Sequence, residues 1–245
     1  MIRLPSFTQV VAVVAVFGGS AMGGSAWRAS AGAVRVEPLA APIAFLPEDG
    51  ALRRGPGGAP AVHVFGDYEC PSCRAFEARA GKALRALADA GRLHLVYHDA
   101  TLSAHRWGNA AAAAVHCAVR DENGKRLDDE PDDPMQPMDE RGWMVHDAIY
   151  EQAAEWKQAA DPPAAIARSA AEAMGDGGGE KPSGIARLED CMAGEHTWSV
   201  LREARDRARR AGIHEVPAVI AGGQRLRFTS YRSLVRYVTK RVATP

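Results

Sequence analysis

Two cysteines separated by two residues, Cys70 and Cys73, are the side chains of this sequence with the clearest capacity for chemistry. Paired thiols at this spacing can exchange with another disulfide, form a lasting structural disulfide, or supply two ligands of a zinc site. The sequence contains no second Cys-x-x-Cys to complete a zinc site, and the other cysteines, Cys117 and Cys191, stand alone. We therefore expect redox chemistry at the Cys70–Cys73 pair and no bound metal.

The residues around this pair predict a strand, helix, strand unit. Residues 61–65 form a short apolar run typical of a β-strand, and residues 66–69 lead from it directly to Cys70. Apolar side chains then recur at helical spacing up to Ala90, and residues 93–97 again have the composition of a strand. Such a crossover normally pairs its two strands in parallel.

This placement gives the two thiols different acidities. Proline favours the first position of a helix, so Pro71 makes Cys70 the residue that caps the helix. Cys70 then faces unpaired backbone amides and the positive end of the helix dipole, which lower the pKa of a thiol. Cys73 lies one turn further on and is partly shielded. We expect Cys70 to react with substrate and Cys73 to resolve the mixed disulfide.

The rest of the chain predicts further helices and a second piece of sheet. Residues 103–211 have mainly helical patterns, interrupted by an acid-rich stretch at 121–140 and a glycine run at 175–179. After them, residues 216–220 and 225–228 are short apolar runs on either side of a Gly-Gly pair, which is a hairpin signal. A closing helix is expected over residues 231–242.

Two stretches of the sequence resemble the DsbA-like branch of the thioredoxin superfamily. They are Phe-Gly-Asp-Tyr-Glu-Cys-Pro-Ser-Cys at 65–73 and Gly-Ile-His-Glu-Val-Pro-Ala-Val at 212–219. The resemblance implies an α/β thioredoxin fold with an inserted helical domain. The resemblance covers roughly residues 61–242. Together with the composition of the N-terminal residues, it divides the chain into a leader, a linker, a first half of the thioredoxin domain, a helical insertion and a second half, at residues 1–31, 32–60, 61–102, 103–211 and 212–245.

The resemblance also implies roles for residues near the dithiol. It predicts a cis peptide before Pro217, with Val216 and Pro217 lying against the dithiol and binding substrate. Valine before this proline is frequent in DsbA-like oxidases, whereas isomerases and reductases more often carry threonine. Pro71 and Ser72, between the cysteines, are expected to tune how far the reduced thiolate is stabilised and so how oxidising the disulfide is. Asp67 and Glu69 are expected either to steer protons during exchange or to solvate the turn.

Some DsbA-like proteins hold the helical domain together with an extra disulfide. The resemblance therefore implies a structural bridge between Cys117 and Cys191, although two buried free thiols are the alternative. Closing a loop of this length stabilises a fold by roughly 4 kcal/mol if chain entropy dominates.

The first residues indicate where the chain works. A run without charges extends from Leu4 to Trp27, with an apolar centre at 10–17 and small residues after it. This pattern is typical of a secretory signal peptide, and its length also suits a retained membrane anchor. We expect an extracytoplasmic protein, in the periplasm or cell envelope, because disulfides persist in such compartments.

Composition excludes some classes of partner. Thirty basic and thirty acidic residues give no net charge to attract nucleic acid, and basic residues near the C-terminus are interleaved with acids. We expect a monomer without cofactor that oxidises reduced or misoxidised exported proteins and is reoxidised by a membrane redox partner. The alternatives are a reductase or isomerase of the same fold, and a non-catalytic metal-handling protein that uses the cysteine pair as ligands.

Overall fold

The computed structural model describes residues 34–41, 51–120, 139–175 and 183–243. The expected leader at residues 1–31, most of the acid-rich stretch 121–140 and most of the glycine run 175–179 lie outside these residues. No helix in the described part of the chain has the length and apolar character that crossing a membrane requires.

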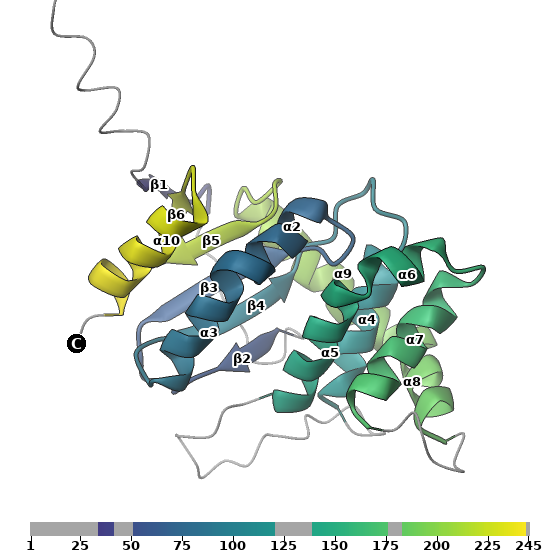
Figure 1. Cartoon of the computed structure of the whole chain (residues 1–245). Coiled ribbons are helices and arrows are strands. Elements are labelled where there is room, and N and C mark those ends of the chain that lie inside the picture. The colour runs from purple at the N-terminus through teal and green to yellow at the C-terminus, as the bar shows by residue number, and fades with distance from the viewer. Residues whose placement is uncertain (1–33, 42–50, 121–138, 176–182, 244–245) are drawn as a thin grey trace, which may run out of the picture.

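A six-stranded mixed sheet forms the centre of the fold (Figure 1). Its strand order is β1-β6-β5-β3-β4-β2, in which β3 and β4 pair in parallel and the other neighbouring strands of this order pair antiparallel. The strands are β1 (Arg35–Pro38), β2 (Leu52–Arg54), β3 (Ala61–Gly66), β4 (His94–Asp99), β5 (Ala218–Ala221) and β6 (Gln224–Arg227).

The predicted strand, helix, strand unit is present. Its helical run consists of α2 (Pro71–Phe76), a π-helical segment η1 (Glu77–Gly81) and α3 (Lys82–Asp89). The register of β3 with β4 places Gly66 opposite Asp99, so both parallel strands end at the same edge of the sheet. The segments that follow these two strands therefore meet beside the dithiol.

Helices α4 to α9 gather at one side of the sheet (Figure 1). Helix α4 lies at their centre and contacts α5, α7, α8 and α9. Five consecutive alanines in α4, from 110 to 114, allow these neighbours to approach closely, because alanine adds little bulk to a helix. The bounds are α4 (Gly108–Ala118), α5 (Glu140–Glu151), α6 (Ala153–Gln158), α7 (Pro162–Ala173), α8 (Ser183–Ala193) and α9 (Glu195–Arg210).

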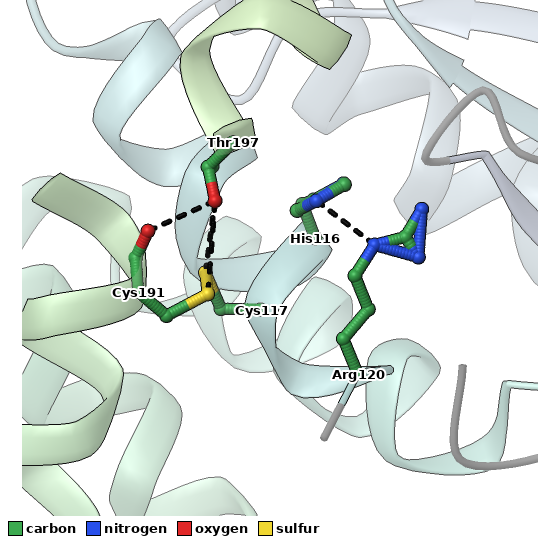
Figure 2. Close-up of a disulfide and its surroundings, with 5 residues drawn as sticks. All are labelled: His116, Cys117, Arg120, Cys191 and Thr197. Atoms are coloured by element: carbon green, nitrogen blue, oxygen red, sulfur yellow. Dashed lines mark hydrogen bonds between the residues drawn. A yellow bond between two sulfur atoms is a disulfide. The ribbon is translucent and has the colours of Figure 1, made fainter. Parts of the chain in front are cut away.

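The helical region contains the disulfide that the family resemblance implied (Figure 2). Cys117 on α4 and Cys191 on α8 are bonded to each other and lie 74 residues apart in the sequence. Thr197, in the first turn of α9, donates a hydrogen bond from its hydroxyl to the Cys191 carbonyl oxygen at 2.9 Å. The bridge thus joins two helices at a point where a third one begins.

The predicted hairpin is formed by β5 and β6. Gly222 and Gly223 connect the two strands with φ angles of 57° and 71°, a backbone conformation that side chains other than glycine rarely adopt. Helix α10 (Tyr231–Tyr237) follows and continues into the π-helical segment η2 (Val238–Val242). Ser230 caps α10, since its hydroxyl accepts a hydrogen bond from the Ser233 amide.

The expectation of a plain linker over residues 32–60 is wrong, because this segment supplies two strands of the sheet. Strand β1 pairs antiparallel with β6, and β2 pairs antiparallel with β4. Both are short edge strands that carry little apolar periodicity of their own, and pairing with neighbouring strands holds them in place. The other boundaries of the expected division of the chain stay a prediction.

Candidate dithiol site

Cys70 lies at the junction between strand β3 and helix α2. It is the N-cap residue of the helix, with φ −77° and ψ 121°, and Pro71 occupies the first helical position. The Cys70 amide donates to the Asp67 carbonyl oxygen at 3.1 Å, and the Arg74 amide donates to the Cys70 carbonyl oxygen at 3.1 Å. The backbone therefore holds this cysteine at the opening turn, as its sequence position predicts.

The Cys70 thiol is strongly acidic, with its pKa lowered from the usual value near 9 to about 5. A hydrogen bond from the Cys73 thiol is the largest cause, and burial of the Cys70 sulfur opposes it. The Ser72 hydroxyl, 3.0 Å from the Cys70 sulfur, and the amides of Ser72 and Cys73 also stabilise the thiolate. Hydrogen bonds from the helix's first turn thus account for the acidity that the sequence position predicted.

Cys73 has the opposite character. Burial raises its pKa far above the usual value, and the hydrogen bond that it donates to Cys70 and the charge of Cys70 raise the pKa further. Its side chain is fully covered, since the residue is 1% exposed, whereas Cys70 is 7% exposed. Cys70 is therefore more covered than expected but remains the more accessible of the two cysteines. The site contains one thiolate and one thiol at neutral pH.

The loop before β5 lies against the dithiol. The peptide bond between Val216 and Pro217 is cis, as the family resemblance implied. The Ser72 hydroxyl, between the two cysteines, donates a hydrogen bond to the Val216 carbonyl oxygen at 3.3 Å. From α10, the Tyr231 hydroxyl donates to the Ser72 carbonyl oxygen at 3.5 Å. Residues far apart in the sequence thus meet at the Cys-Pro-Ser-Cys turn.

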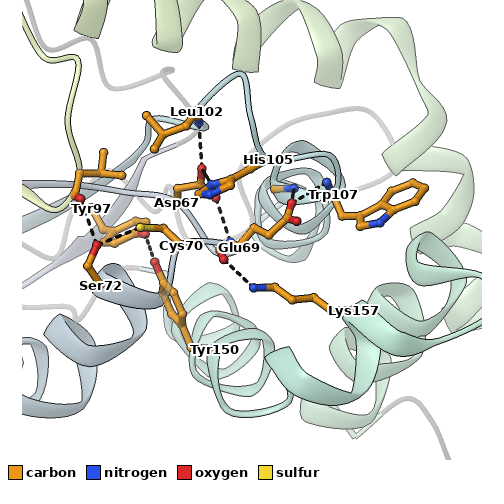
Figure 3. A network of polar contacts seen from close by, with 12 residues as sticks. Asp67, Glu69, Cys70, Ser72, Tyr97, Leu102, His105, Trp107, Tyr150 and Lys157 are labelled. Atoms are coloured by element: carbon orange, nitrogen blue, oxygen red, sulfur yellow. Dashed lines mark hydrogen bonds and ion pairs between the residues drawn. The ribbon is translucent and has the colours of Figure 1, made fainter.

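Asp67 joins the ends of the two parallel strands (Figure 3). Its carboxylate is buried and accepts hydrogen bonds from the Glu69 amide at 2.9 Å and the Leu102 amide at 2.8 Å. His105 contacts the same carboxylate through Nδ1 at 2.6 Å. Gly108 leaves room for this carboxylate, because a Cβ at that position would lie 2.7 Å from an Asp67 oxygen. These contacts give Asp67 a positioning role in the turn before Cys70.

Glu69 connects the same turn to the helical region. Its carboxylate accepts hydrogen bonds from the amides of Trp107 at 2.7 Å and Gly108 at 3.0 Å, at the start of α4. A negative charge at a helix N-terminus is stabilised by the helix dipole. In addition, Lys157 on α6 donates from Nζ to the Glu69 carbonyl oxygen at 2.5 Å (Figure 3). Both carboxylates that the sequence singled out therefore hold the loop in place.

Several residues near the dithiol escaped the sequence analysis. The hydroxyls of Tyr97 on β4 and Tyr150 on α5 lie 2.6 Å apart, and burial raises the pKa of both phenols well above the usual value. Burial, with the charge of Asp67, raises the pKa of Asp99 to about 8. The positions of Tyr97 and Asp99 near the end of a strand parallel to β3 are a signal that could have identified them.

The histidines of the sheet form polar contacts with other groups of the protein. His94 and His98 lie four residues apart on β4, about 13 Å along an extended strand, which is too far for both to bind one metal ion. His94 contacts the Gly55 carbonyl oxygen through Nδ1 at 2.9 Å, and His98 contacts Nδ1 of His63 through Nε2 at 3.0 Å. Within the described ranges, no group of three or more His, Cys, Asp or Glu side chains is arranged to hold a metal ion.

Comparisons with known proteins agree with this architecture. Residues 49–128 match the family model described as thioredoxin. Oxidised BdbD from Bacillus subtilis superposes with a TM-score of 0.61 at 18% identity, covering 85% of this chain and 100% of that one. The chain has the DsbA-like thioredoxin fold. No curated protein sequence matches it.

Two further solved structures share the DsbA-like thioredoxin fold with this chain. MdbA, a thiol-disulfide oxidoreductase from Actinomyces oris, has a TM-score of 0.58 at 16% identity, covering 78% of this chain and 88% of that one. Oxidised Mtb DsbA has a TM-score of 0.51 at 18% identity, covering 80% of this chain and 93% of that one. The inserted helical region expected from the sequence is thus confirmed as part of the fold.

Proposed function

We propose that this chain is an extracytoplasmic thiol–disulfide oxidoreductase that introduces disulfides into exported proteins. The observation that carries the proposal is the difference in acidity within one dithiol, where the pKa of Cys70 is about 5 and that of Cys73 is raised far above its usual value. An acidic thiol at a helix N-terminus next to a buried partner suits thiol–disulfide exchange. Cys70 and Cys73 are the catalytic residues in this proposal.

The proposed reaction begins with Cys70 and Cys73 joined as a disulfide. A thiolate of the client protein attacks the Cys70 sulfur, a mixed disulfide forms, and Cys73 leaves and takes up a proton. A second client thiolate then attacks the client sulfur of the mixed disulfide, and Cys70 leaves as a thiolate. The client loses two electrons and gains a disulfide, and the protein gains both electrons as a reduced dithiol. A membrane redox partner restores the protein disulfide.

The acidity of Cys70 supports the proposed direction of electron flow. A thiolate with a low pKa is a good leaving group, so release of the oxidised client is fast. Stabilising the thiolate also stabilises the reduced protein, which makes its disulfide more oxidising. Ser72 and the Pro71-initiated helix contribute to this stabilisation, and Val216 before the cis-proline agrees with the oxidase assignment implied by the family resemblance.

The loop at Val216 and Pro217 is the proposed contact for the client backbone. Proline has no amide hydrogen, so its nitrogen forms no hydrogen bond that an approaching chain would have to displace. An extended client segment next to Cys70 can pair with the backbone of Val216 and be held in line for exchange. Asp67 and Glu69 support this geometry by fixing the turn that precedes Cys70.

An extracytoplasmic location is part of the proposal. The bond between Cys117 and Cys191 supports it, because such disulfides persist in oxidising compartments and are rare in the cytosol. The uncharged N-terminal run of the sequence, as a signal peptide or a membrane anchor, gives the route of export.

The reduction potential of the Cys70–Cys73 couple tests the proposed function. The protein is equilibrated in glutathione buffers, trapped by alkylation and analysed by mass spectrometry, with Cys70→Ser as the control that lacks the couple. We expect a potential well above the value of about −270 mV for thioredoxin. A potential near that value would contradict the oxidase assignment. Failure of the couple to exchange with glutathione at all would contradict the oxidoreductase assignment.

A further inference from the structure

A groove of about 1040 Å³ extends from the cis-proline loop along the side of the fold that carries α10. Val216 and Pro217 form its end nearest the dithiol. Its sides come from β6, the connection from β6 to α10, helix α10 itself, and the η1–α3 part of the helical run. The volume is at the upper end of the range for ligand sites and exceeds what a small thiol requires.

Arginine dominates the charged lining of this groove. Among the described residues that line the groove, five are arginines and one carries a carboxylate, whereas the sequence as a whole has equal numbers of basic and acidic residues. The five arginines come from three elements and from no single helix: Arg79, Arg225, Arg227, Arg232 and Arg236. The carboxylate belongs to Glu215. The groove is therefore a local cationic surface in a protein without net charge.

Two of these arginines are engaged by acids of the protein itself. Glu215 contacts Arg225 at 3.4 Å and Arg227 at 2.8 Å, and Glu37 on β1 contacts Arg227 at 2.8 Å. These ion pairs fix the two guanidinium groups along β6. The two carboxylates neutralise two of the five arginine charges, so the groove keeps a net positive charge.

The remaining three arginines are available to a ligand. The guanidinium of Arg79 lies 5.7 Å from the centre of the Tyr231 ring, in a cation–π contact. Arg232 and Arg236 are exposed, one turn apart on α10. None of the three forms a salt bridge with the residues that the structure describes.

Apolar side chains lie between the charges and lead to the dithiol. Leu226, Phe228 and Val235 line the groove, and Phe228 packs near Tyr231 with ring centres 6.0 Å apart. The Tyr231 hydroxyl reaches the Ser72 carbonyl oxygen at 3.5 Å, inside the Cys-x-x-Cys turn. A polypeptide attached to Cys70 and passing Val216 therefore continues directly into the groove.

We propose that this groove selects client segments in which the reacting cysteine is flanked by acidic and apolar residues. The inference rests on the proposed function, because it names the substrate class of the same dithiol. Planar guanidinium groups bind carboxylates with paired hydrogen bonds, and their contribution grows where the site is partly shielded from water. An acidic, extended segment satisfies the three available arginines while its apolar residues cover the partly exposed Phe228 and Val235.

The test uses two synthetic peptides, each with a pair of reduced cysteines. In one peptide glutamates and a leucine flank the cysteines, and in the other each glutamate is replaced by glutamine. The second-order rate of peptide oxidation by the oxidised protein is measured by stopped flow. We expect roughly a tenfold higher rate for the acidic peptide at low salt, from two to three exposed charge pairs. The advantage falls in 0.5 M NaCl because the charges are screened.

Variants locate the effect. In the double variant Arg232→Gln, Arg236→Gln the ratio of the two peptide rates should fall to about two, because Arg79 remains. The matched control is Arg168→Gln, Arg210→Gln, which removes two exposed arginines of α7 and α9 that do not line the groove, and the ratio should stay near tenfold. Equal rates for both peptides with the unmodified protein, or an undiminished ratio in the groove variant, would overturn the proposal.

A binding measurement separates this inference from the proposed function. Peptides with serine in place of both cysteines are titrated into the protein, and affinity is followed by fluorescence anisotropy of a dye on the peptide. Tighter binding of the acidic peptide supports the groove whether or not the cysteine peptides are oxidised. If neither cysteine peptide is oxidised, that result contradicts the oxidase assignment alone. Oxidation of both peptides at one rate, with equal affinities, would contradict the groove alone.

Discussion

Replacing Ser72 by alanine should weaken the acidity of Cys70. The Ser72 hydroxyl lies 3.0 Å from the Cys70 sulfur and 3.3 Å from the Val216 carbonyl oxygen, and it has one proton to donate. While Cys70 is a thiol, the Ser72 hydroxyl donates this proton to the Val216 carbonyl oxygen. Once Cys70 ionises, the thiolate is the stronger acceptor and receives it. The variant Ser72→Ala removes this donor and leaves the helix start intact.

The expected magnitude follows from the energy of a hydrogen bond to a charged group. Such a bond contributes roughly 1.5–3 kcal/mol, and one pKa unit corresponds to about 1.4 kcal/mol. The pKa of Cys70, about 5 in the unmodified protein, should therefore rise by roughly 1–2 units in Ser72→Ala. Because the reduced form loses the same stabilisation, the disulfide should become less oxidising by about 30–60 mV.

The assay is the rate of Cys70 alkylation by iodoacetamide as a function of pH in the reduced protein. Ser72→Thr is the matched control, because it keeps a hydroxyl at the same position and should keep the inflection near that of the unmodified protein. An inflection in Ser72→Ala that stays within about 0.3 units of the unmodified protein would refute the argument. Equal shifts in both variants would show that the hydroxyl is not the cause.

Three further outcomes follow from the packing. Loss of the bridge in Cys117→Ser, Cys191→Ser should lower the free energy of unfolding by about 4 kcal/mol for a separation of 74 residues, and a loss below about 1 kcal/mol in urea titrations would argue against the entropic account. The pKa of His63 falls from 6.5 to about 4, because burial disfavours its charged form and His94 adds repulsion. As the pH falls, the unfolded state therefore takes up a proton before the folded state does. The free energy of unfolding should fall by roughly 2.5 kcal/mol between pH 7 and pH 4.5, and the variant His63→Gln should lose this part of the pH dependence. In Gly66→Ala the new Cβ would clash with the Tyr97 hydroxyl, so the melting temperature should fall, and an unchanged melting temperature would contradict this.

The dithiol unit was predictable from sequence because its signals are local. A strand, a cysteine and a proline at the first helical position follow each other within a dozen residues, and each fixes its own backbone conformation. The hairpin at Gly222 and Gly223 was predictable for the same reason, since both residues adopt positive φ. The cis peptide before Pro217 came from the family resemblance and from no local pattern.

The two edge strands and the supports of the site could not be predicted in this way. Strand β2 has three residues, and pairing with β4 defines it. The contacts of Asp67 with His105, and of Glu69 with the start of α4, join residues more than thirty-five positions apart. Sequence reasoning assigned these carboxylates to proton movement or to solvation, because a partner's position after folding is not encoded in the spacing of charges.

The pKa of each cysteine of the dithiol, measured in the reduced protein, tests the central claim most directly. Alkylation from pH 3 to pH 9 is quantified at each site by mass spectrometry, with Cys70→Ser as the blank. We predict an inflection near pH 5 for Cys70 and no modification of Cys73 across this range. A Cys70 that titrates near the usual value for a thiol, or a Cys73 that reacts first, would contradict the account.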